Sequence, residues 1–220
     1  QGKWLIILRT LSAGGPYTIT LTGHNTIVFE NVMVGEVWLC SGQSNMEWSA
    51  RSGIVNAEQE IKNSGNPMIR LLTVSHSASV YPQDRMEGSW QVCTPASMEY
   101  FSAVGYFFAR KIQKELGVAV GIINSSWGGT PAEAWTPETA VTSNLYLREA
   151  AKLLKPVPWG PVEPGRLYNS MIAPLVQYRI AGVLWYQGEA NTANYYAYSR
   201  ILGNLIESWR SKWGYEFPFY

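Results

Sequence analysis

The stretch GEVWLCSGQSNM, residues 35–46, decides how the rest of the chain is interpreted. Its first half is an apolar run that predicts a buried strand over Glu36 to Ser41. Its second half places glycine and small polar residues directly after that strand. In α/β domains the turns at the carboxyl ends of strands carry the chemistry, so this stretch predicts both a central strand and a functional loop.

Outward from this stretch, predicted strands alternate with predicted helices. Phe101, Val104, Phe108, Ile112 and Leu116 recur at helical spacing, and a glycine follows at the expected stop. Further strands are expected at residues 69–74, 118–124 and 180–186, and helices at about 55–63, 101–116, 136–154, 168–177 and 201–213. The last of these helices is expected to be amphipathic, with an apolar face formed by Ile201, Leu202, Leu205, Ile206, Trp209 and Trp213. This alternation predicts an α/β fold in three layers, α/β/α, with a mainly parallel sheet covered on both faces.

The two ends of the chain differ from the middle. Residues 4–30 predict β-strands joined by turns at Gly14-Gly15-Pro16 and Gly23-His24-Asn25. We therefore expect residues 1–33 to end a preceding β-rich segment and residues 34–220 to form the main domain. Phe217 to Tyr220 predicts the start of another strand, so we also expect that domain to be truncated at its C-terminus.

Composition and charge exclude several classes of protein. Hydrophobic residues make up 46% of the chain, charged residues 15%, and the net charge is +1 without a basic run, so we expect no nucleic-acid and no membrane partner. The longest apolar runs, such as Trp4 to Leu8, are too short to cross a bilayer. Cys40 and Cys93 are expected to be buried thiols rather than a disulfide, and no spacing of Cys or His predicts a metal site.

Three loops join glycine to small polar residues just beyond a predicted strand. They are Gly42 to Met46, Ser125 to Thr130 and Gln187 to Asn191. Acyl transfer needs a nucleophilic hydroxyl and N–H donors where the oxyanion forms, and glycine exposes backbone N–H groups. Purely structural roles stay open at this point: Ser44 and Asn191 as helix caps, and Gly128-Gly129 as turn residues.

The same loops resemble the conserved blocks of SGNH hydrolases, specifically the sialate O-acetylesterase branch. Gly-Gln-Ser-Asn-Met at 42–46 is similar to the first block, Trp-Gly-Gly-Thr at 127–130 to the second, and Trp-Tyr-Gln-Gly-Glu-Ala-Asn at 185–191 to the third. The segments at 101–107 and 167–175 also resemble that branch. The resemblance covers nearly the whole chain and implies an SGNH or flavodoxin-like fold.

The resemblance implies a role for individual residues. Ser44 matches the nucleophile, and its own N–H is one oxyanion donor. Gly128 matches the glycine whose N–H joins it, with Gly129 as the fallback, and Asn191 matches the asparagine whose side chain supplies a third N–H.

A second group of residues is expected to bind substrate or to support the site. Gln187 and Glu189 favour support of the third loop over direct chemistry, and Gln43 is placed in the same group. Trp135 is expected either to stack on a sugar or to pack in the core.

One part of the family pattern is absent. The family places its general base in an Asp-x-x-His motif, and these 220 residues contain no such motif. Their only histidines are His24, in the β-segment, and His76, which follows a predicted strand and is the fallback base. We expect a missing C-terminal segment of the same protein to supply the base, and the 220 residues alone to be nearly inactive.

The function implied is a serine esterase that removes O-acetyl groups from carbohydrates without a cofactor or metal. The sugar stays open between sialic acid and other acetylated glycans. A non-catalytic carbohydrate-binding module that retains the fold is the alternative, and a lipase or thioesterase is a third class. The resemblance further implies a periplasmic or extracellular location.

Overall fold

A mixed β-sheet forms the centre of the molecule. In the computed structural model, which describes Ile6 and residues 11–220, the strands are β1 (Gly14–Thr22), β2 (Thr26–Gly42), β3 (Asn66–Thr73), β4 (Gln91–Cys93), β5 (Ala119–Ser126) and β6 (Gly182–Tyr186). β2 pairs parallel with β5 and β6, and β3 pairs parallel with β5. Antiparallel pairs join β4 to β3 and β1 to β2. The predicted parallel centre is confirmed, and the antiparallel β4 is an addition to the prediction.

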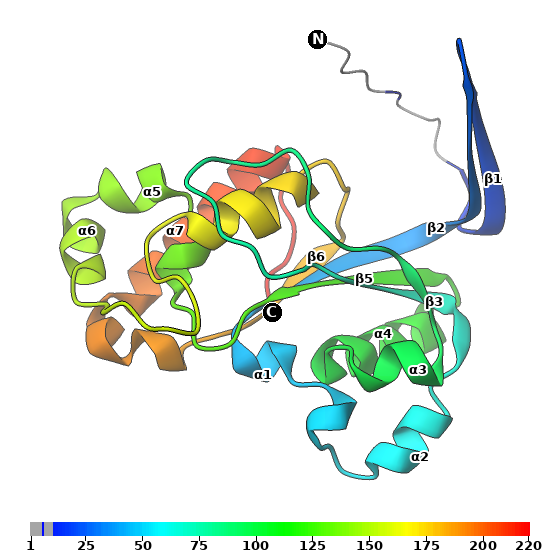
Figure 1. The fold of residues 1–220 in the computed structure, drawn as a ribbon, viewed down its shortest axis with the longest axis horizontal. Coiled ribbons are helices and arrows are strands. Elements are labelled where there is room, and N and C mark those ends of the chain that lie inside the picture. The colour runs from blue at the N-terminus through cyan, green and yellow to red at the C-terminus, as the bar shows by residue number, and fades with distance from the viewer. Residues whose placement is uncertain (1–5, 7–10) are drawn as a thin grey trace.

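Helices lie on both sides of this sheet (Figure 1). One side carries α2 (Ala57–Lys62), α3 (Pro95–Glu99) and α4 (Ala103–Leu116), and the other carries α5 (Glu138–Thr142), α6 (Leu145–Ala151) and α7 (Tyr198–Trp213). α1 (Ser44–Glu47) follows β2 directly. Shorter helical turns are η1 (Ala50–Ser52), η2 (Ala132–Trp135), η3 (Tyr168–Ile172), η4 (Ala173–Leu175) and η5 (Glu189–Ala197).

The strand side chains fill two separate cores. Leu39 and Ile123 join the cluster beneath α7, whereas their neighbours Cys40 and Ile122 join the cluster beneath α4. Successive residues of a strand point to opposite faces, so an unbroken apolar run buries both faces of the sheet. This is the pattern that the sequence around residue 39 predicts.

The long amphipathic helix α7 agrees with the sequence pattern, whereas α4 agrees only in part. α7 buries Ile201, Leu205, Trp209 and Trp213, all of which belong to the predicted apolar face. α4 begins at Ala103 rather than at residue 101, and it ends as predicted at Leu116, followed by Gly117 in the left-handed conformation. The predicted stripe is buried only in part: Phe101, Phe108 and Ile112 belong to or pack against the core, whereas Val104 and Leu116 are 36% and 54% exposed. The smaller residues Ala103, Gly105 and Ala109 are buried as well.

Two predicted long helices are instead broken into pieces. Residues 136–154 contain α5 and α6, separated at Asn144, whose side-chain oxygen accepts from the Leu147 N–H at 3.2 Å. A side chain that caps a new helix in this way ends the previous one. Residues 168–177 contain a π-helical turn followed by the 3-10 turn η4, rather than an α-helix.

The two ends of the chain extend the sheet in different ways. Gly23 to Asn25 forms the turn between β1 and the outer half of β2, and this hairpin projects away from the helices (Figure 1). The strand expected from Trp4 onward lies mostly outside the described residues. At the other end, the predicted strand start is confirmed: the N–H groups of Val183 and Trp185 donate to the carbonyls of Pro218 and Tyr220, both at 2.9 Å. The predicted domain boundary at residue 33 falls inside the continuous strand β2.

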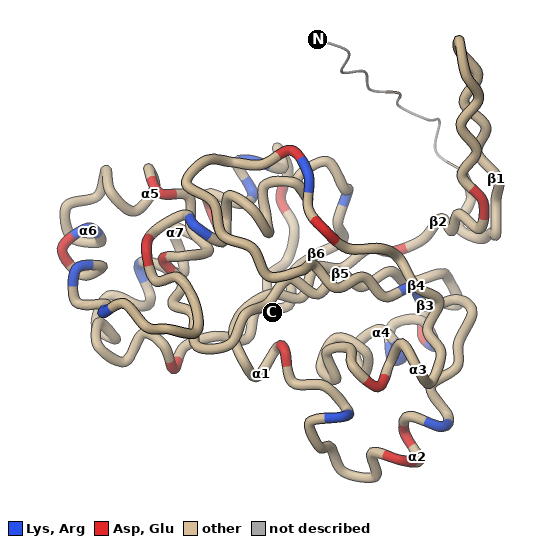
Figure 2. Tube along the Cα trace, viewed as in Figure 1, with Lys and Arg blue, Asp and Glu red and all other residues tan. Residues whose placement is uncertain are grey.

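Several surface and composition expectations can be compared with the structure. Cys40 and Cys93 are free and buried, as expected. Within Ile6 and residues 11–220, no helix is both long enough and apolar enough to cross a membrane. Lys and Arg are scattered among Asp and Glu along the drawn chain instead of collecting on one element (Figure 2).

Candidate active site

The three polar loops meet at one end of the sheet. Gly42, the last residue of β2, pairs with Ser126 at the end of β5 and with Tyr186 at the end of β6. A Cβ on Gly42 would stand 2.2 Å from the Tyr186 carbonyl oxygen, at a φ of +136°, so the close approach of these strand ends requires glycine. The loops that follow therefore start from adjacent positions.

Gln43 joins the first loop to the third. Its N–H donates to the Tyr186 carbonyl at 3.0 Å, and its Oε1 accepts from the N–H groups of Gly188 and Ala190 at 3.3 and 3.1 Å. Asn45 adds a bond from Nδ2 to Glu189 Oε1 at 2.7 Å. Through these bonds the buried Gln43 and the carboxylate of Glu189 hold the two loops together.

Ser44 is the first residue of α1 and is exposed to solvent. The N-cap position belongs to Gln43, so the alternative of Ser44 as a helix cap does not describe this structure. Within the part of the chain that the structure describes, Ser44 Oγ forms no hydrogen bond. The hydroxyl is therefore available to a ligand at the point where the loops meet.

Gly128 lies directly against Ser44. A Cβ on Gly128 would be 3.5 Å from Ser44 Cβ and 3.2 Å from a carboxylate oxygen of Glu47. The Gly128 N–H donates to Glu47 Oε2 at 2.7 Å. Gly129 is one residue further away, and its φ of +72° and its contact with Trp159 give it a separate reason to be glycine. Of the two glycines, Gly128 is the one beside Ser44.

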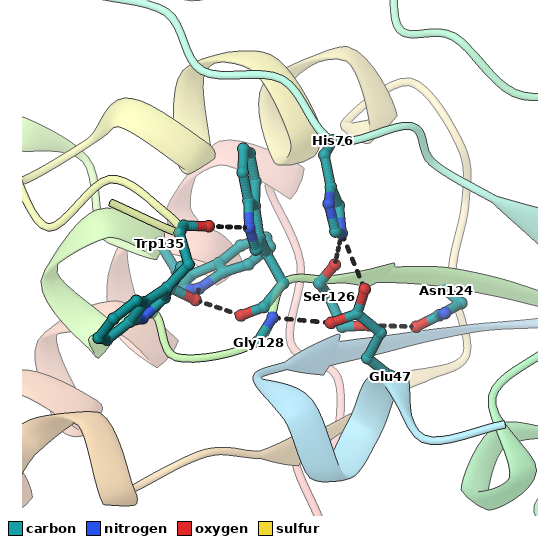
Figure 3. A network of polar contacts seen from close by, with 9 residues as sticks. Glu47, His76, Asn124, Ser126, Gly128 and Trp135 are labelled. Carbon is teal, nitrogen blue, oxygen red and sulfur yellow. Dashed lines mark hydrogen bonds and ion pairs between the residues drawn. The ribbon is translucent and has the colours of Figure 1, made fainter. Parts of the chain in front are cut away.

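Glu47 and His76 form an ion pair beside Gly128, and neither was expected to contact the other from the sequence (Figure 3). His76 Nε2 lies 3.1 Å from Glu47 Oε1 and 3.0 Å from the Ser126 carbonyl, and its ring stacks on Trp127 at 4.2 Å. The signal available in the sequence was the position of Glu47, three residues after Ser44, which places both on one side of a helical turn.

The ion pair shifts the pKa of both partners. The hydrogen bond to Glu47 raises the pKa of His76 above its ordinary 6.5, although burial acts in the opposite direction. Burial alone would raise the pKa of Glu47, but the hydrogen bonds from His76 and from the Gly128 N–H outweigh it and lower that pKa below 4.5. An anion is thus held at the N–H that was expected to bind the oxyanion.

Asn191 lies in a different arrangement from the one that the sequence implied. Its side chain is 1% exposed, and Nδ2 donates to Glu133 Oε2 at 2.7 Å and to Asn194 Oδ1 at 3.0 Å. Its Oδ1 accepts from the Ala132 N–H and from Gln187 Nε2 at 2.9 and 2.8 Å. Both amide hydrogens are in use, so donation to an oxyanion would require one of these bonds to be released. Asn191 lies within η5 and is not a helix cap.

Trp135 and Gln187 are structural in this arrangement. Trp135 is 0% exposed and donates from Nε1 to Thr130 Oγ1 at 2.9 Å, so the expectation that it stacks on a sugar is wrong and its alternative, a packed core residue, is correct. Gln187 also donates to the Thr130 carbonyl at 3.2 Å and accepts from the Tyr198 hydroxyl at 2.9 Å, as support of its loop requires. Among the described residues, no group of three or more His, Cys, Asp and Glu could hold a metal ion.

The similarity to known proteins agrees with this site. The family model for carbohydrate esterases described as sialic acid-specific acetylesterases matches residues 34–219. The chain belongs to this family. It is 35% identical to the sialate O-acetylesterases of Homo sapiens and Pongo abelii, covering 94% of this chain and 42% of each relative. It is also similar to the crystal structure of the carbohydrate acetylesterase XAC1771 from Xanthomonas citri, with 35% identity, a TM-score of 0.85, and coverage of 96% of this chain and 47% of that one.

The match to the family includes the candidate site, but the chain spans less than half the length of these relatives. The matched region includes all three loops, from Gly42 to Asn191. The chain spans less than half the length of the mouse sialate O-acetylesterase as well, 47%, at 32% identity. The comparisons therefore assign the family to this chain, while the activity of the whole protein is a matter for proposal.

Proposed function

We propose that the protein is a serine esterase that removes O-acetyl groups from carbohydrates. The observation that carries the proposal is the exposed Ser44, whose backbone and Cβ lie against Gly128 at the meeting point of three loops. Family membership supports the reaction class, because the relatives are named as acetylesterases of sialic acid or other carbohydrates. Sialic acid and other acetylated glycans are both compatible with this proposal.

In the proposed reaction, Ser44 Oγ attacks the carbonyl carbon of the acetyl ester while a general base takes its proton. The tetrahedral intermediate breaks its bond to the sugar oxygen, which leaves as an alcohol after it receives that proton. Water then attacks the acetylated serine and releases acetate. Neither step changes an oxidation state, so the reaction needs no redox partner.

We propose the N–H groups of Ser44 and Gly128 as the oxyanion donors. Backbone donors fixed in place before the reaction stabilise the developing charge without reorganisation. Glu47 accepts from the Gly128 N–H in this structure, so an incoming ester oxygen would take over a position that a carboxylate now holds. Asn191 supports the third loop in this proposal and would contribute a donor only by leaving Glu133 or Asn194.

We propose that the general base comes from outside these 220 residues, as the absent Asp-x-x-His motif suggests. His76 is the other candidate, because it stands at the correct end of the sheet. Its Nε2, however, lies within hydrogen-bonding distance of Glu47 and the Ser126 carbonyl, so this nitrogen is already in use. A base must reach the proton that it removes.

The finer fold and location belong to the same proposal. The two cores on opposite faces of the sheet support the three-layer SGNH arrangement. A periplasmic or extracellular location, implied by the resemblance, is tested by fractionating cells that produce the protein and following its acetylesterase activity.

The first test uses the full-length protein with O-acetylated sugars and small acetate esters. Ser44→Ala should reduce acetate release by several orders of magnitude, because only binding and the oxyanion donors are left. Ser143→Ala, which changes an exposed hydroxyl bonded within its own helix turn, is the matched control and should keep wild-type activity. Equal activity in wild type and Ser44→Ala would eliminate serine catalysis, and retained sugar binding without turnover would favour the binding-module alternative.

A second variant decides the identity of the base. His76→Ala should lower kcat far less than Ser44→Ala if the base is supplied from elsewhere in the protein. A loss as large as that of Ser44→Ala, with unchanged folding by circular dichroism, would assign the proton transfer to His76. His76→Ala also removes the ring that stacks on Trp127, which is why the folding control is needed for this variant.

A further inference from the structure

An exposed tryptophan packs against Gly129, the residue that follows the glycine beside the proposed nucleophile. Trp159 is 59% exposed and lies at the tip of a tight turn, which Val157 and Gly160 close by an antiparallel bridge. Isolated exposed apolar residues are ordinary on protein surfaces. The position and the anchoring of Trp159 are the features that distinguish it.

The turn is fixed to the second polar loop. The Trp127 Nε1–H donates to the Trp159 carbonyl at 2.8 Å. Gly160 packs so closely that a Cβ there would lie 2.9 Å from Thr130 Cγ2 and 3.3 Å from Trp127 Nε1. Pro158 precedes the tryptophan and restricts the backbone. The turn therefore presents its exposed indole from a constrained backbone.

The indole lies on Gly129. A Cβ on Gly129 would stand 2.4 Å from Trp159 Nε1 and 2.7 Å from Cδ1, which no side chain could occupy without moving the ring. Gly128, the next residue back, packs against Ser44 in the same manner. Two neighbouring glycines thus connect Ser44 to the exposed ring: Gly128 packs against Ser44, and Gly129 packs against Trp159.

The chemistry of this ring suits a sugar. The indole offers an apolar face, and its Nε1–H donates to no residue within Ile6 and residues 11–220. A pyranose ring has an apolar face of C–H groups and a rim of hydroxyls, so it can stack on the indole and accept from its N–H. The charged pair of the site, Glu47 and His76, contacts Gly128 and Trp127. The indole of Trp159 contacts the next residue, Gly129.

We propose that Trp159 is the stacking platform for the sugar ring that carries the acetyl ester, and so determines specificity for carbohydrate esters over simple ones. This inference rests on the proposed acetylesterase function and deepens it. It also replaces Trp135, the aromatic residue that the sequence suggested for this role and that the structure buries.

The test compares two substrates on the full-length protein: an O-acetylated methyl glycoside and ethyl acetate, which has no ring. Trp159→Ala should raise KM for the glycoside so that the ratio of kcat/KM values, glycoside over ethyl acetate, falls by about 5- to 10-fold, the effect of losing one aromatic contact. Trp159→Phe should restore most of that ratio because it retains a ring face. Trp159→Leu, which is apolar without a ring face, should not.

Trp90→Phe is the matched control. Trp90 is also a partly exposed tryptophan, 36%, but it lies against Gly121, toward the start of β5 and away from the loops. It should leave the ratio unchanged. An unchanged ratio in Trp159→Ala, or full recovery by Trp159→Leu, would refute the proposal that the sugar ring stacks on Trp159. Absence of Ser44-dependent turnover on both substrates would instead refute the proposed function, so the two failures are distinguishable.

Discussion

Glu133 shows at the residue scale how strongly the third loop depends on one buried acceptor. The side chain is 1% exposed, and its two oxygens accept from Asn191 Nδ2 and Asn194 Nδ2, both at 2.7 Å. Each oxygen therefore satisfies a different amide. Within the part of the chain that the structure describes, no basic side chain pairs with this carboxylate, and the two amides compensate for its burial.

Replacing Glu133 by Gln should destabilise the protein. The new side chain keeps one acceptor and turns the other oxygen into an NH₂ group that faces an amide donor, which leaves a buried donor unsatisfied. The expected cost is about 1–3 kcal/mol in the free energy of unfolding. The melting temperature of Glu133→Gln should fall by several degrees relative to Glu138→Gln, an exposed control on α5. Equal melting temperatures for the two variants would contradict the network.

The Glu47–His76 pair predicts a pH dependence of stability. The raised pKa of His76 means that its contribution is complete below pH 6.5 and is lost as pH rises through the raised value. The lowered pKa of Glu47 means that its contribution is present above pH 4.5 and is lost as pH falls through the lowered value. The pair therefore stabilises the folded protein most between pH 4.5 and pH 6.5, the ordinary pKa values of the two groups.

The measurement is the difference in melting temperature between wild type and Glu47→Gln. It should be largest near pH 5.5 and shrink by pH 8.5. Both side chains are 39% exposed, so solvent screening limits the contribution to about 1 kcal/mol or less. A difference that is constant across this range would show that the hydrogen bond to Gly128, rather than the charge pair, accounts for the effect of Glu47.

At the scale of elements, α4 rests on the sheet through its smallest residues. A Cβ on Gly105 would be 3.2 Å from both Cys40 Sγ and Ile122 Cγ2. Together with Ala109, this glycine lets the helix approach β2 and β5 closely. Only part of the apolar stripe predicted from large residues therefore packs against this core, through Phe101, Phe108 and Ile112. Val104 and Leu116 of that stripe are exposed, and the closest contact with the sheet is made by small side chains.

Two glycine variants test this packing in opposite directions. Gly105→Val should lower the free energy of unfolding by about 1–3 kcal/mol, because its methyl groups overpack the contact. Gly203→Ala, on α7, should raise it by about 0.5–1 kcal/mol, since a Cβ there meets nothing within 4 Å and alanine favours the helix. Chemical denaturation of both variants measures these changes, and a neutral Gly105→Val would show that α4 can move outward without cost.

At the scale of the whole molecule, β2 connects the two regions of the structure. Its outer half pairs with β1 in the hairpin, and its inner half lies between β5 and β6. A cavity of 590 Å³ lies where these halves meet, lined by hairpin residues such as Phe29 and sheet residues such as Val37. It is at the opposite end of the parallel strands from Ser44, so the hairpin and the candidate active site occupy separate ends of the sheet.

The sequence alone determined the parts that depend on local pattern. An apolar run followed by glycine and polar residues predicted β2 and its loop, and helical spacing predicted α7 and its buried face, because both signals lie within one element. The three family blocks identified Ser44, Gly128 and Asn191 as the residues to examine.

Only the tertiary structure decided which of these side chains are free and which are in use. Glu133 is 58 residues from Asn191 yet occupies its amide, and Glu47 is 81 residues from Gly128 yet accepts its N–H. Trp135 and Trp159 are both tryptophans near polar loops, but one packs at 0% exposure and the other stands at 59%. Hydrogen bonds between distant segments, and the burial of a side chain, depend on how the elements pack together. A local sequence pattern does not specify that packing.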